Sequence, residues 1–293
     1  MSLASEGDSL AHYCSFAGKV GLSFIRVKAM EIPFSQWHAA IAVRRSRRRY
    51  TPVPLELTQL AQVRTVCQGF RPYVEARAEL ITESPDEVLR GVVASYGKIQ
   101  GAQALVAFIG DTGDRYVNEK IGYTGEGIIL EATAMGLGTC WVGGSLFFRR
   151  GRAESIVGAA KNERVFAVTP VGYAEKEFSV GERVQTGFGM LHQRKPLAEM
   201  VSGLDAKKWP DWVRSALEAA RLAPSAANRQ PWRFYVESNS ITISVDSRLL
   251  EWGISKRLDC GIAMLHIEVA ALDSDVKGKW ELLKAPQVAK FTV

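Results

Sequence analysis

The sequence predicts an α+β fold in which helices cover mostly antiparallel sheets, arranged as two degenerate repeats. Segments with helical periodicity are mixed with short alternating or apolar segments of the kind that form strands. Two segments, 122–132 and 261–271, are mostly apolar, as helices at the centre of a fold are. The order of elements also starts again near residue 206, which indicates an internal repeat.

In the first half, Ser35 is expected to cap a helix over residues 36–43, and Pro52 limits its continuation. Apolar positions at helical spacing predict a second helix within 55–66. The other elements expected before residue 200 are strands at 77–82, 104–109 and 165–171, and a central helix at 125–135 that leads through 136–144 into a strand.

The second half begins with an amphipathic helix at 209–222, and Pro210 suits its first turn. Two strands, 233–236 and 241–245, are joined by Asn239 as a hairpin. A mostly apolar helix at 259–271 follows. Residues 122–132 align with this helix at an offset of 139, whereas the helices at Pro54 and Pro210 are 156 apart, so the repeat carries insertions.

We therefore expect a first repeat at 30–200 and a shorter second repeat at 201–293, packed as one unit. Residues 1–29 are interpreted as an extension, disordered or non-native, ahead of a natural start at Met30.

Composition limits the class of protein. Of the 293 residues, 47% are hydrophobic and 23% charged, which supports a packed core. No apolar run approaches the roughly 18 residues of a membrane span, and no secretory signal pattern is present, so we expect a cytoplasmic protein with no membrane partner. Four cysteines and four histidines are scattered, which argues against a disulfide framework and a metal site. The net charge of +6 favours anionic ligands.

Five arginines cluster within residues 44–49, around Ser46. Clustered guanidinium groups suit bidentate binding of phosphate, and the serine adds a hydroxyl donor. A solvated basic face, the usual role of a charge run, also explains it, and a nucleic-acid patch is a third interpretation. The arginines are Arg44, Arg45, Arg47, Arg48 and Arg49.

The run from Pro224 to Trp232 follows a helix directly and precedes a strand. Its small residues let a ligand approach the backbone, while Ser225, Asn228 and Gln230 offer directional hydrogen bonds. A well-capped loop would explain the proline and the asparagine, but not the whole run.

Glycines at 136, 138, 143 and 144 flank Trp141 without forming a dinucleotide fingerprint. They could bring backbone N–H groups close to a flat ligand, although a helix C-cap also explains the first two. Glu131 and Glu268 lie in apolar helices, where an unpaired carboxylate would be costly; either could be a structural partner for a buried arginine, and neither is assigned a catalytic role. No Ser–His–Asp or Cys–His arrangement stands out, so the chemistry is expected to come from a cofactor.

Together these segments resemble the nitroreductase superfamily of FMN enzymes from about residue 35 onward. The family's Arg-x-Ser-x-Arg/Lys-x-aromatic motif is matched by Arg44, Ser46, Arg48 and Tyr50. Its Pro-Ser-x-x-Asn-x-Gln-Pro-Trp motif is matched by residues 224–232. Residues 136–144 match the strand that passes the flavin ring, and 194–195 match a late basic pair that reaches the phosphate.

One departure from the family pattern concerns the second motif. In ordinary members it follows the arginine motif in one short chain, and each flavin lies at a dimer interface. Here the corresponding place reads Gln68 to Pro72, and the motif occurs only in the second repeat, which lacks an arginine motif of its own. The resemblance is therefore to the single-chain, pseudo-dimeric branch of TM nitroreductase type, and it implies one complete flavin site per chain.

By this resemblance, one group of residues would hold the phosphate and ribityl end of FMN: Arg44, Arg45, Ser46, Arg48, Arg194 and Lys195. A second group would approach from the second repeat: Pro224, Ser225, Ala226 and Asn228. Val142, Gly143 and Gly144 would line the isoalloxazine, with a backbone N–H near N5.

The resemblance also implies a ping-pong oxidoreductase in which NAD(P)H gives a hydride to flavin N5 and a nitroaromatic or quinone then accepts it. Solvent can supply the protons, so no catalytic residue is expected. The partner would be a small-molecule electron acceptor, with no nucleic acid, and a monomer is expected because the usual dimer interface is internal. Two alternatives stay open: a flavin-binding or redox-sensing protein without turnover, and specialised flavin chemistry such as reductive dehalogenation.

Overall fold

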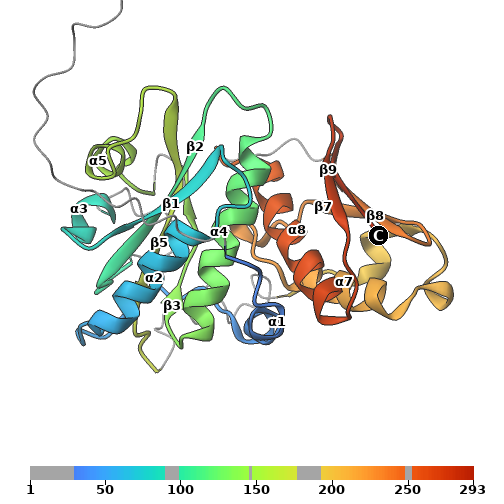
Figure 1. Cartoon of the computed structure of the whole chain (residues 1–293), viewed down its shortest axis with the longest axis horizontal. Coiled ribbons are helices and arrows are strands. Elements are labelled where there is room, and N and C mark those ends of the chain that lie inside the picture. The colour runs from blue at the N-terminus through green and yellow to red at the C-terminus, as the bar shows by residue number, and fades with distance from the viewer. Residues whose placement is uncertain (1–29, 90–98, 145–146, 177–192, 248–252) are drawn as a thin grey trace, which may run out of the picture.

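The computed structural model describes residues 30–89, 99–144, 147–176, 193–247 and 253–293. In this part of the chain, two five-stranded sheets lie on either side of a central layer of helices (Figure 1). This mixture of helices and mainly antiparallel sheets confirms the predicted α+β class.

The first sheet is antiparallel throughout and has the order β1-β2-β5-β3, with β4 also paired to β5. In β2, side chains of even-numbered residues face the main core, while those of odd-numbered residues face a second, smaller core under α3 and α5. Both faces of this strand are therefore buried. The strands are β1 (Ala76–Ile81), β2 (Ala104–Asp111), β3 (Gly138–Thr139), β4 (Val142–Gly143) and β5 (Glu163–Gly172).

The second sheet has the order β6-β7-β8-β10-β9, in which β6 is parallel to β7 and the other pairs are antiparallel. Its last four strands follow the same order as the first sheet. In each half, two antiparallel strands come first, then a long apolar helix and a short strand, and finally a strand that pairs with the second strand of the half. This two-sheet arrangement is consistent with an internal pseudo-dimer. The strands are β6 (Val201–Gly203), β7 (Trp232–Val236), β8 (Ser240–Val245), β9 (Lys279–Leu282) and β10 (Gln287–Thr292).

The helices of the first half are α1 (Phe34–Val43), α2 (Leu57–Gly69), α3 (Pro85–Leu89), α4 (Val117–Ala134) and α5 (Arg150–Ile156). Those of the second half are α7 (Asp211–Leu222) and α8 (Lys256–Asp273), with short 3-10 turns at Leu197–Glu199, Ala206–Lys208 and Ala226–Asn228. The two long helices, α4 and α8, pack on each other between the sheets (Figure 1).

The crossing of α4 and α8 depends on two glycines. A Cβ placed on Gly122 would lie 2.1 Å from the carbonyl oxygen of Leu258, and one placed on Gly261 would lie 2.1 Å from that of Glu119. Each glycine thus faces the carbonyl three residues before the other glycine. This reciprocal contact is the pattern of a twofold interface, in the register given by the offset of 139.

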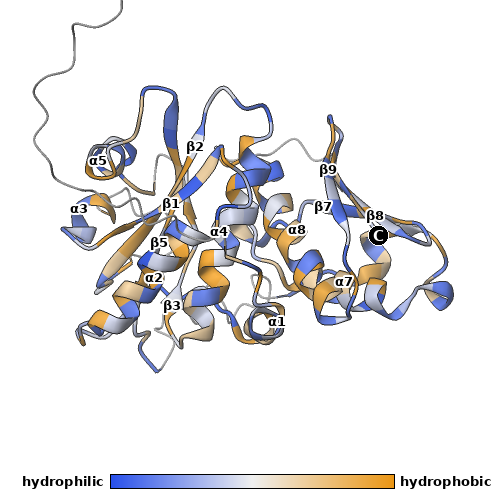
Figure 2. Cartoon of the chain, viewed as in Figure 1, coloured by the Kyte–Doolittle hydropathy of each residue, from blue (hydrophilic) through white to orange (hydrophobic). Residues whose placement is uncertain are grey.

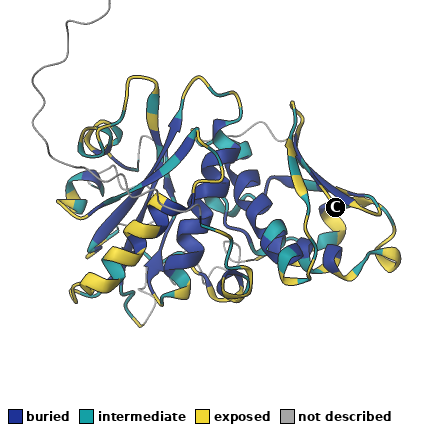
Figure 3. Cartoon of the chain, in the orientation of Figure 1, coloured by how far each residue is buried: buried dark blue, intermediate teal, exposed yellow. Residues whose placement is uncertain are grey.

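Apolar and buried residues are concentrated on these central helices and on the inner faces of the sheets (Figures 2 and 3). Within the described residues, no helix is long and apolar enough to cross a membrane. The expected extension at 1–29 lies outside the described residues.

Three expected element boundaries were wrong. Ser35 does not cap α1, which begins at Phe34 after Pro33; the Ser35 hydroxyl donates instead to Asp273 at 3.0 Å. Pro210 is the N-cap of α7 rather than a member of its first turn. The central helix α4 begins at Val117, eight residues before the expected start, because its charged first turns are buried with partners distant in sequence, such as Arg257 for Glu119.

Candidate functional site

The arginine motif lies where α1 ends, beside the strand that follows α4. Arg44 is the C-cap residue of α1, and its N–H donates to the Ala40 carbonyl at 2.8 Å. Ser46 forms a parallel bridge with Thr139 of β3, and the N–H of Arg47 donates to the Thr139 carbonyl at 2.8 Å. The two segments that the sequence assigned to phosphate and ring are therefore neighbours.

Arg44 is a buried cation with little to balance it. Its side chain is 5% exposed, and its nearest carboxylate is Glu126, with Nε 3.8 Å from Oε1. The Arg44 Nε is buried without a hydrogen-bond partner in the described part of the chain. Burial lowers the pKa of Arg44, which means that its charge is held at a cost. A solvated basic face does not describe this residue.

Two further arginines, Arg45 and Arg194, lie near Arg44. The pKa of Arg194 is lowered to about 10, first by burial and then by the nearby cations Arg44, Arg45 and Arg221. Arg194, just before the 3-10 turn at Leu197–Glu199, thus has three further guanidinium groups near it, two directly after α1 and one in the last turn of α7. Such an arrangement is expected where an anion binds.

Arg221, the cation near Arg194 that the sequence reasoning did not single out, donates from Nε to Glu218 at 2.7 Å. It lies in the last turn of α7, directly before the loop that carries the Pro-Ser motif. A basic residue at a helix C-terminus has an ordinary structural role there, so its position alone did not mark it.

The loop from Pro224 to Gln230 has an irregular backbone held by specific contacts. Ala227, Asn228 and Gln230 have positive φ angles of 50°, 52° and 47°. The Ser225 hydroxyl accepts from the N–H of Gln230 at 3.0 Å, and an Asp259 carboxylate oxygen accepts from the N–H of Ala226 at 3.1 Å. A conformation this uncommon for non-glycine residues is a feature of functional loops.

This loop contacts the late basic pair. Arg194 donates to the side-chain oxygen of Asn228 and, at 3.0 Å, to the carbonyl of Leu222. The Lys195 ammonium donates to the carbonyls of Arg229 and Gln230, at 2.8 and 3.0 Å. The structure therefore brings the predicted residues Arg194, Lys195 and Asn228 together, with Lys195 bonded to the loop backbone.

The glycine pair after Trp141 faces the second half of the chain. A Cβ on Gly143 would lie 3.1 Å from the Ile254 side chain, and Gly144 has a φ of 84°, which favours glycine. The Val142 side chain packs in the smaller core on the other face of the sheet, so only its backbone could face a ligand. Of the other predicted residues, Arg45 is exposed, and Ser46 and Arg48 are half-buried.

Glu126 forms a buried network that the sequence reasoning did not identify. Its Oε2 accepts from the indole N–H of Trp141 at 2.7 Å, and its Oε1 lies 3.0 Å from Nε2 of His266. The other ring nitrogen of His266 lies 2.8 Å from the Ala219 carbonyl oxygen. Both Glu126 and His266 are fully buried.

The suggested arginine partners are not the ones that Glu131 and Glu268 have. Glu131 accepts from the indole of Trp37 at 2.7 Å and from the Gln62 amide at 3.1 Å. Glu268 accepts from the Tyr123 hydroxyl at 2.6 Å, and from the indole of a tryptophan in β9. Uncharged donors satisfy both carboxylates, because tryptophan and tyrosine can carry an N–H or O–H into an apolar core.

The place after α2, which corresponds to the loop after α7, is filled by aromatic side chains. Phe70 packs edge-on against Trp37, with ring centroids 5.0 Å apart, and is stacked on Tyr123 at 6.2 Å. A Cβ on Gly127 would lie 2.3 Å from the Phe70 ring. This packing leaves no loop of the Pro-Ser type at that position.

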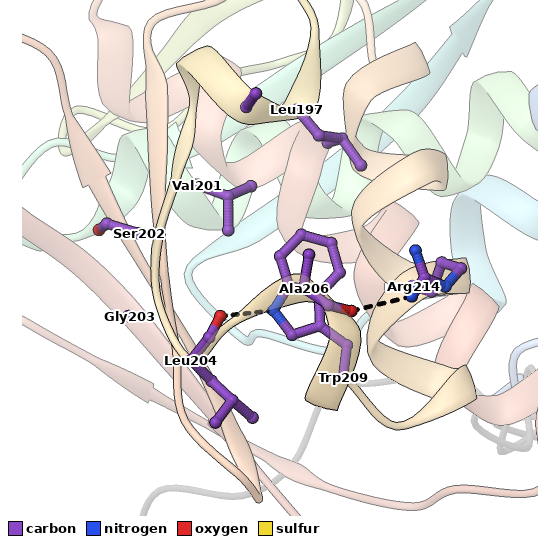
Figure 4. A pocket seen from close by; sticks show the side chains of 9 residues that line it. Leu197, Val201, Ser202, Gly203, Leu204, Ala206, Trp209 and Arg214 are labelled. Atoms are coloured by element: carbon purple, nitrogen blue, oxygen red, sulfur yellow. Dashed lines mark hydrogen bonds between the residues drawn. The ribbon is translucent and has the colours of Figure 1, made fainter.

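A separate pocket of about 370 Å³ lies near β6 and the start of α7 (Figure 4). Trp209 donates its indole N–H to the Leu204 carbonyl at 2.8 Å, and Arg214 donates to the Ala206 carbonyl at 2.9 Å. The pocket contains none of the predicted site residues. Its polar groups bond to the chain itself, so it has no evident part in the site.

The fold and the site define an α+β protein of two related halves with a cluster of arginines where α1, β3 and the loop after α7 meet. A family model described as "Putative TM nitroreductase" matches residues 37–271. The chain belongs to this family, as the sequence motifs indicated.

A solved structure that covers most of the chain shows the same fold, and others are similar to part of it. A putative nitroreductase from Thermotoga maritima MSB8 has a TM-score of 0.59 and 18% identity, and the match covers 87% of this chain and 93% of that one. A nitroreductase family protein from Clostridium difficile 630 has a TM-score of 0.41 and 21% identity over 57% of this chain and 96% of that one. An FMN-dependent nitroreductase from Clostridium difficile R20291 has a TM-score of 0.39 and 16% identity over 54% and 98%. No curated protein matches the chain.

Proposed function

We propose that this protein is an FMN-dependent oxidoreductase with one flavin site per chain. The observation that carries the proposal is the buried Arg44, whose Nε has no hydrogen-bond partner in the described part of the chain and which has Arg45 and Arg194 near it. A terminal phosphate supplies the negative charge and the several acceptor oxygens that such a cluster needs. Membership of the nitroreductase family supports FMN as the source of that phosphate.

The residues divide between the two ends of the cofactor. Arg44, Arg45 and Arg194, with Ser46 and Arg48 beside them, would hold the phosphate and ribityl end. The loop at 224–228 would close over it from the second half, and the backbone of 142–144 would lie along the ring. Bound FMN would supply the redox chemistry, hydride uptake from NAD(P)H and its delivery to a nitroaromatic or quinone.

The chain's own contribution is to bind, orient and exclude water. The glycine segment would offer backbone N–H groups to the ring, and no side chain is proposed to transfer a proton. The Phe70 packing at the corresponding place in the first half supports a single site per chain. We also propose a monomer that takes a small-molecule acceptor and no nucleic acid.

The test is flavin binding followed by turnover. Protein saturated with FMN and gel-filtered should retain close to one flavin per chain, and two per chain would contradict the proposed single site. NADH or NADPH should bleach the flavin absorbance under anaerobic conditions, and a quinone should restore it. Bleaching without any acceptor turnover would favour a redox-sensing protein, and no bleaching would exclude the proposed mechanism.

Variants locate the site. Arg44→Met should abolish retention of FMN, because it removes the central cation. Arg64→Met is the matched control, since Arg64 is an exposed arginine of α2. Equal flavin retention by both variants would show that the phosphate assignment is wrong.

A further inference from the structure

The hydrogen bonds of His266 fix where one of its protons lies. Its Nδ1 is 2.8 Å from the carbonyl oxygen of Ala219. A carbonyl oxygen can only accept, so a hydrogen bond here requires the proton on Nδ1. The Nε2 then faces Glu126 Oε1 at 3.0 Å, in a fully buried setting.

A second proton must lie between Nε2 and the Glu126 carboxyl group. If it is on Nε2, the pair is an imidazolium with a carboxylate; if it is on Glu126, the pair is a neutral imidazole with a carboxylic acid. The net charge of the pair is zero in both arrangements. The other carboxyl oxygen of Glu126 is engaged by the Trp141 indole N–H at 2.7 Å.

This neutrality has a consequence for Arg44. Glu126 is the carboxylate within ion-pair distance of Arg44 among the described residues, at 3.8 Å. Because His266 already balances Glu126, the group of three carries a net charge of +1. The positive charge of Arg44 is therefore not neutralised by Glu126 and can be balanced by an anionic ligand. The buried Nε of Arg44 also has no hydrogen-bond partner in the described part of the chain.

We propose that His266 and Glu126 are positioning residues that keep the charge of Arg44 available for the phosphate of the cofactor. This inference rests on the proposed function, which supplies the phosphate. His266 acts from α8 in the second half on Glu126 of α4 and Arg44 of α1 in the first. The proposal thus assigns to the second half a share in phosphate binding beyond the loop at 224–228.

The test compares FMN with riboflavin, which lacks only the phosphate. His266→Gln retains a donor to Glu126 but removes the ring that shares the second proton, so Glu126 ionises beside Arg44 and pairs with it. The preference for FMN over riboflavin should then fall by about tenfold to a hundredfold, as expected for loss of a charge-assisted hydrogen bond. Riboflavin affinity should stay close to that of the wild type.

The double variant Glu126→Gln with His266→Gln restores the net charge of +1 and should recover the FMN preference. His38→Gln is the matched control, because His38 pairs with Asp273 at the surface. Dissociation constants come from quenching of flavin fluorescence. Equal weakening of FMN and riboflavin in His266→Gln, or no recovery in the double variant, would overturn the proposal and leave a structural role.

A second measurement separates failure of this inference from failure of the proposed function. If the wild type bound neither flavin, the proposed function would fail. Nitrogen-15 NMR of the ligand-free protein would then decide the protonation of His266. A protonated Nδ1 with a second proton shared between Nε2 and Glu126 supports the inference, and an unprotonated Nδ1 refutes it whatever the flavin result.

Discussion

The crossing of α4 and α8 gives the most direct test of the fold. Gly261→Ala would place a methyl carbon 2.1 Å from the carbonyl oxygen of Glu119, whereas ordinary contact begins at 3.4 Å. The obstacle is backbone rather than a flexible side chain, so the two helices must part by more than about 1 Å.

The cost follows from the packing that such a shift disturbs. Overpacking of a core typically costs 1–3 kcal/mol, and a gap of 0.5–1 Å forfeits a quarter to a half of each dispersion contact that it opens. The higher helix propensity of alanine relative to glycine offsets up to about 1 kcal/mol of this cost. Because α4 and α8 are both buried along most of their length, we expect the upper end of this range to apply, and a net loss of about 2 kcal/mol in the free energy of unfolding.

Urea denaturation followed by tryptophan fluorescence would measure the change. The matched control is Gly151→Ala in α5, where a Cβ would meet nothing within 4 Å and stability should stay the same or rise slightly. Gly122→Ala should cost about as much as Gly261→Ala, and the double variant less than the sum, since the helices are already apart. If Gly261→Ala were as stable as Gly151→Ala, the close crossing would be refuted.

Three further predictions concern stability. The pKa of Glu163 is lowered from its ordinary value of 4.5 to about 2, mainly by its hydrogen bond to Arg77. The pair therefore stabilises the fold fully at pH values above 4.5, and this stabilisation is lost as the pH falls toward 2. Arg77→Met should therefore cost up to about 3 kcal/mol near neutral pH, with the difference from wild type shrinking between pH 5 and 2 in denaturation titrations; a constant difference would contradict this. Burial raises the pKa of Glu268, which means that its charged form destabilises the fold. Glu268→Gln should therefore increase the thermal midpoint over that of the wild type by more at pH 7 than at pH 4. An equal increase at both pH values would argue against this. Gly144→Ala should cost about 1–2 kcal/mol because of the positive φ, and an unchanged urea midpoint would show that the strain is absent.

Much of the fold was predictable because its elements have strong local signals. The hairpin of β7 and β8 and the long apolar helices confirm the sequence pattern. The strand β6 was not predicted, since three residues paired in parallel with β7 show no periodicity. The polar start of α4 was also missed, because Glu119 is buried through a partner 138 residues away.

The candidate site divides in the same way. Arg44, Arg194 and Asn228 belong to motifs with short, recognisable spacing, and the structure brings them close. Glu126 and His266 are 140 residues apart, and nothing local marks either as part of a pair. A charge pair across the two halves becomes visible only once α4 and α8 are packed together.

The reciprocal glycine crossing bears on how the two halves can differ. In its register, His266 occupies the place that Gly127 holds in the first half, where a Cβ would strike the Phe70 ring at 2.3 Å. Two identical subunits would need a histidine at both places, and the aromatic packing of the first forbids it. A single chain that contains both halves can have histidine at one of the two equivalent positions and glycine at the other. A homodimer of identical subunits could not form this asymmetric buried charge network.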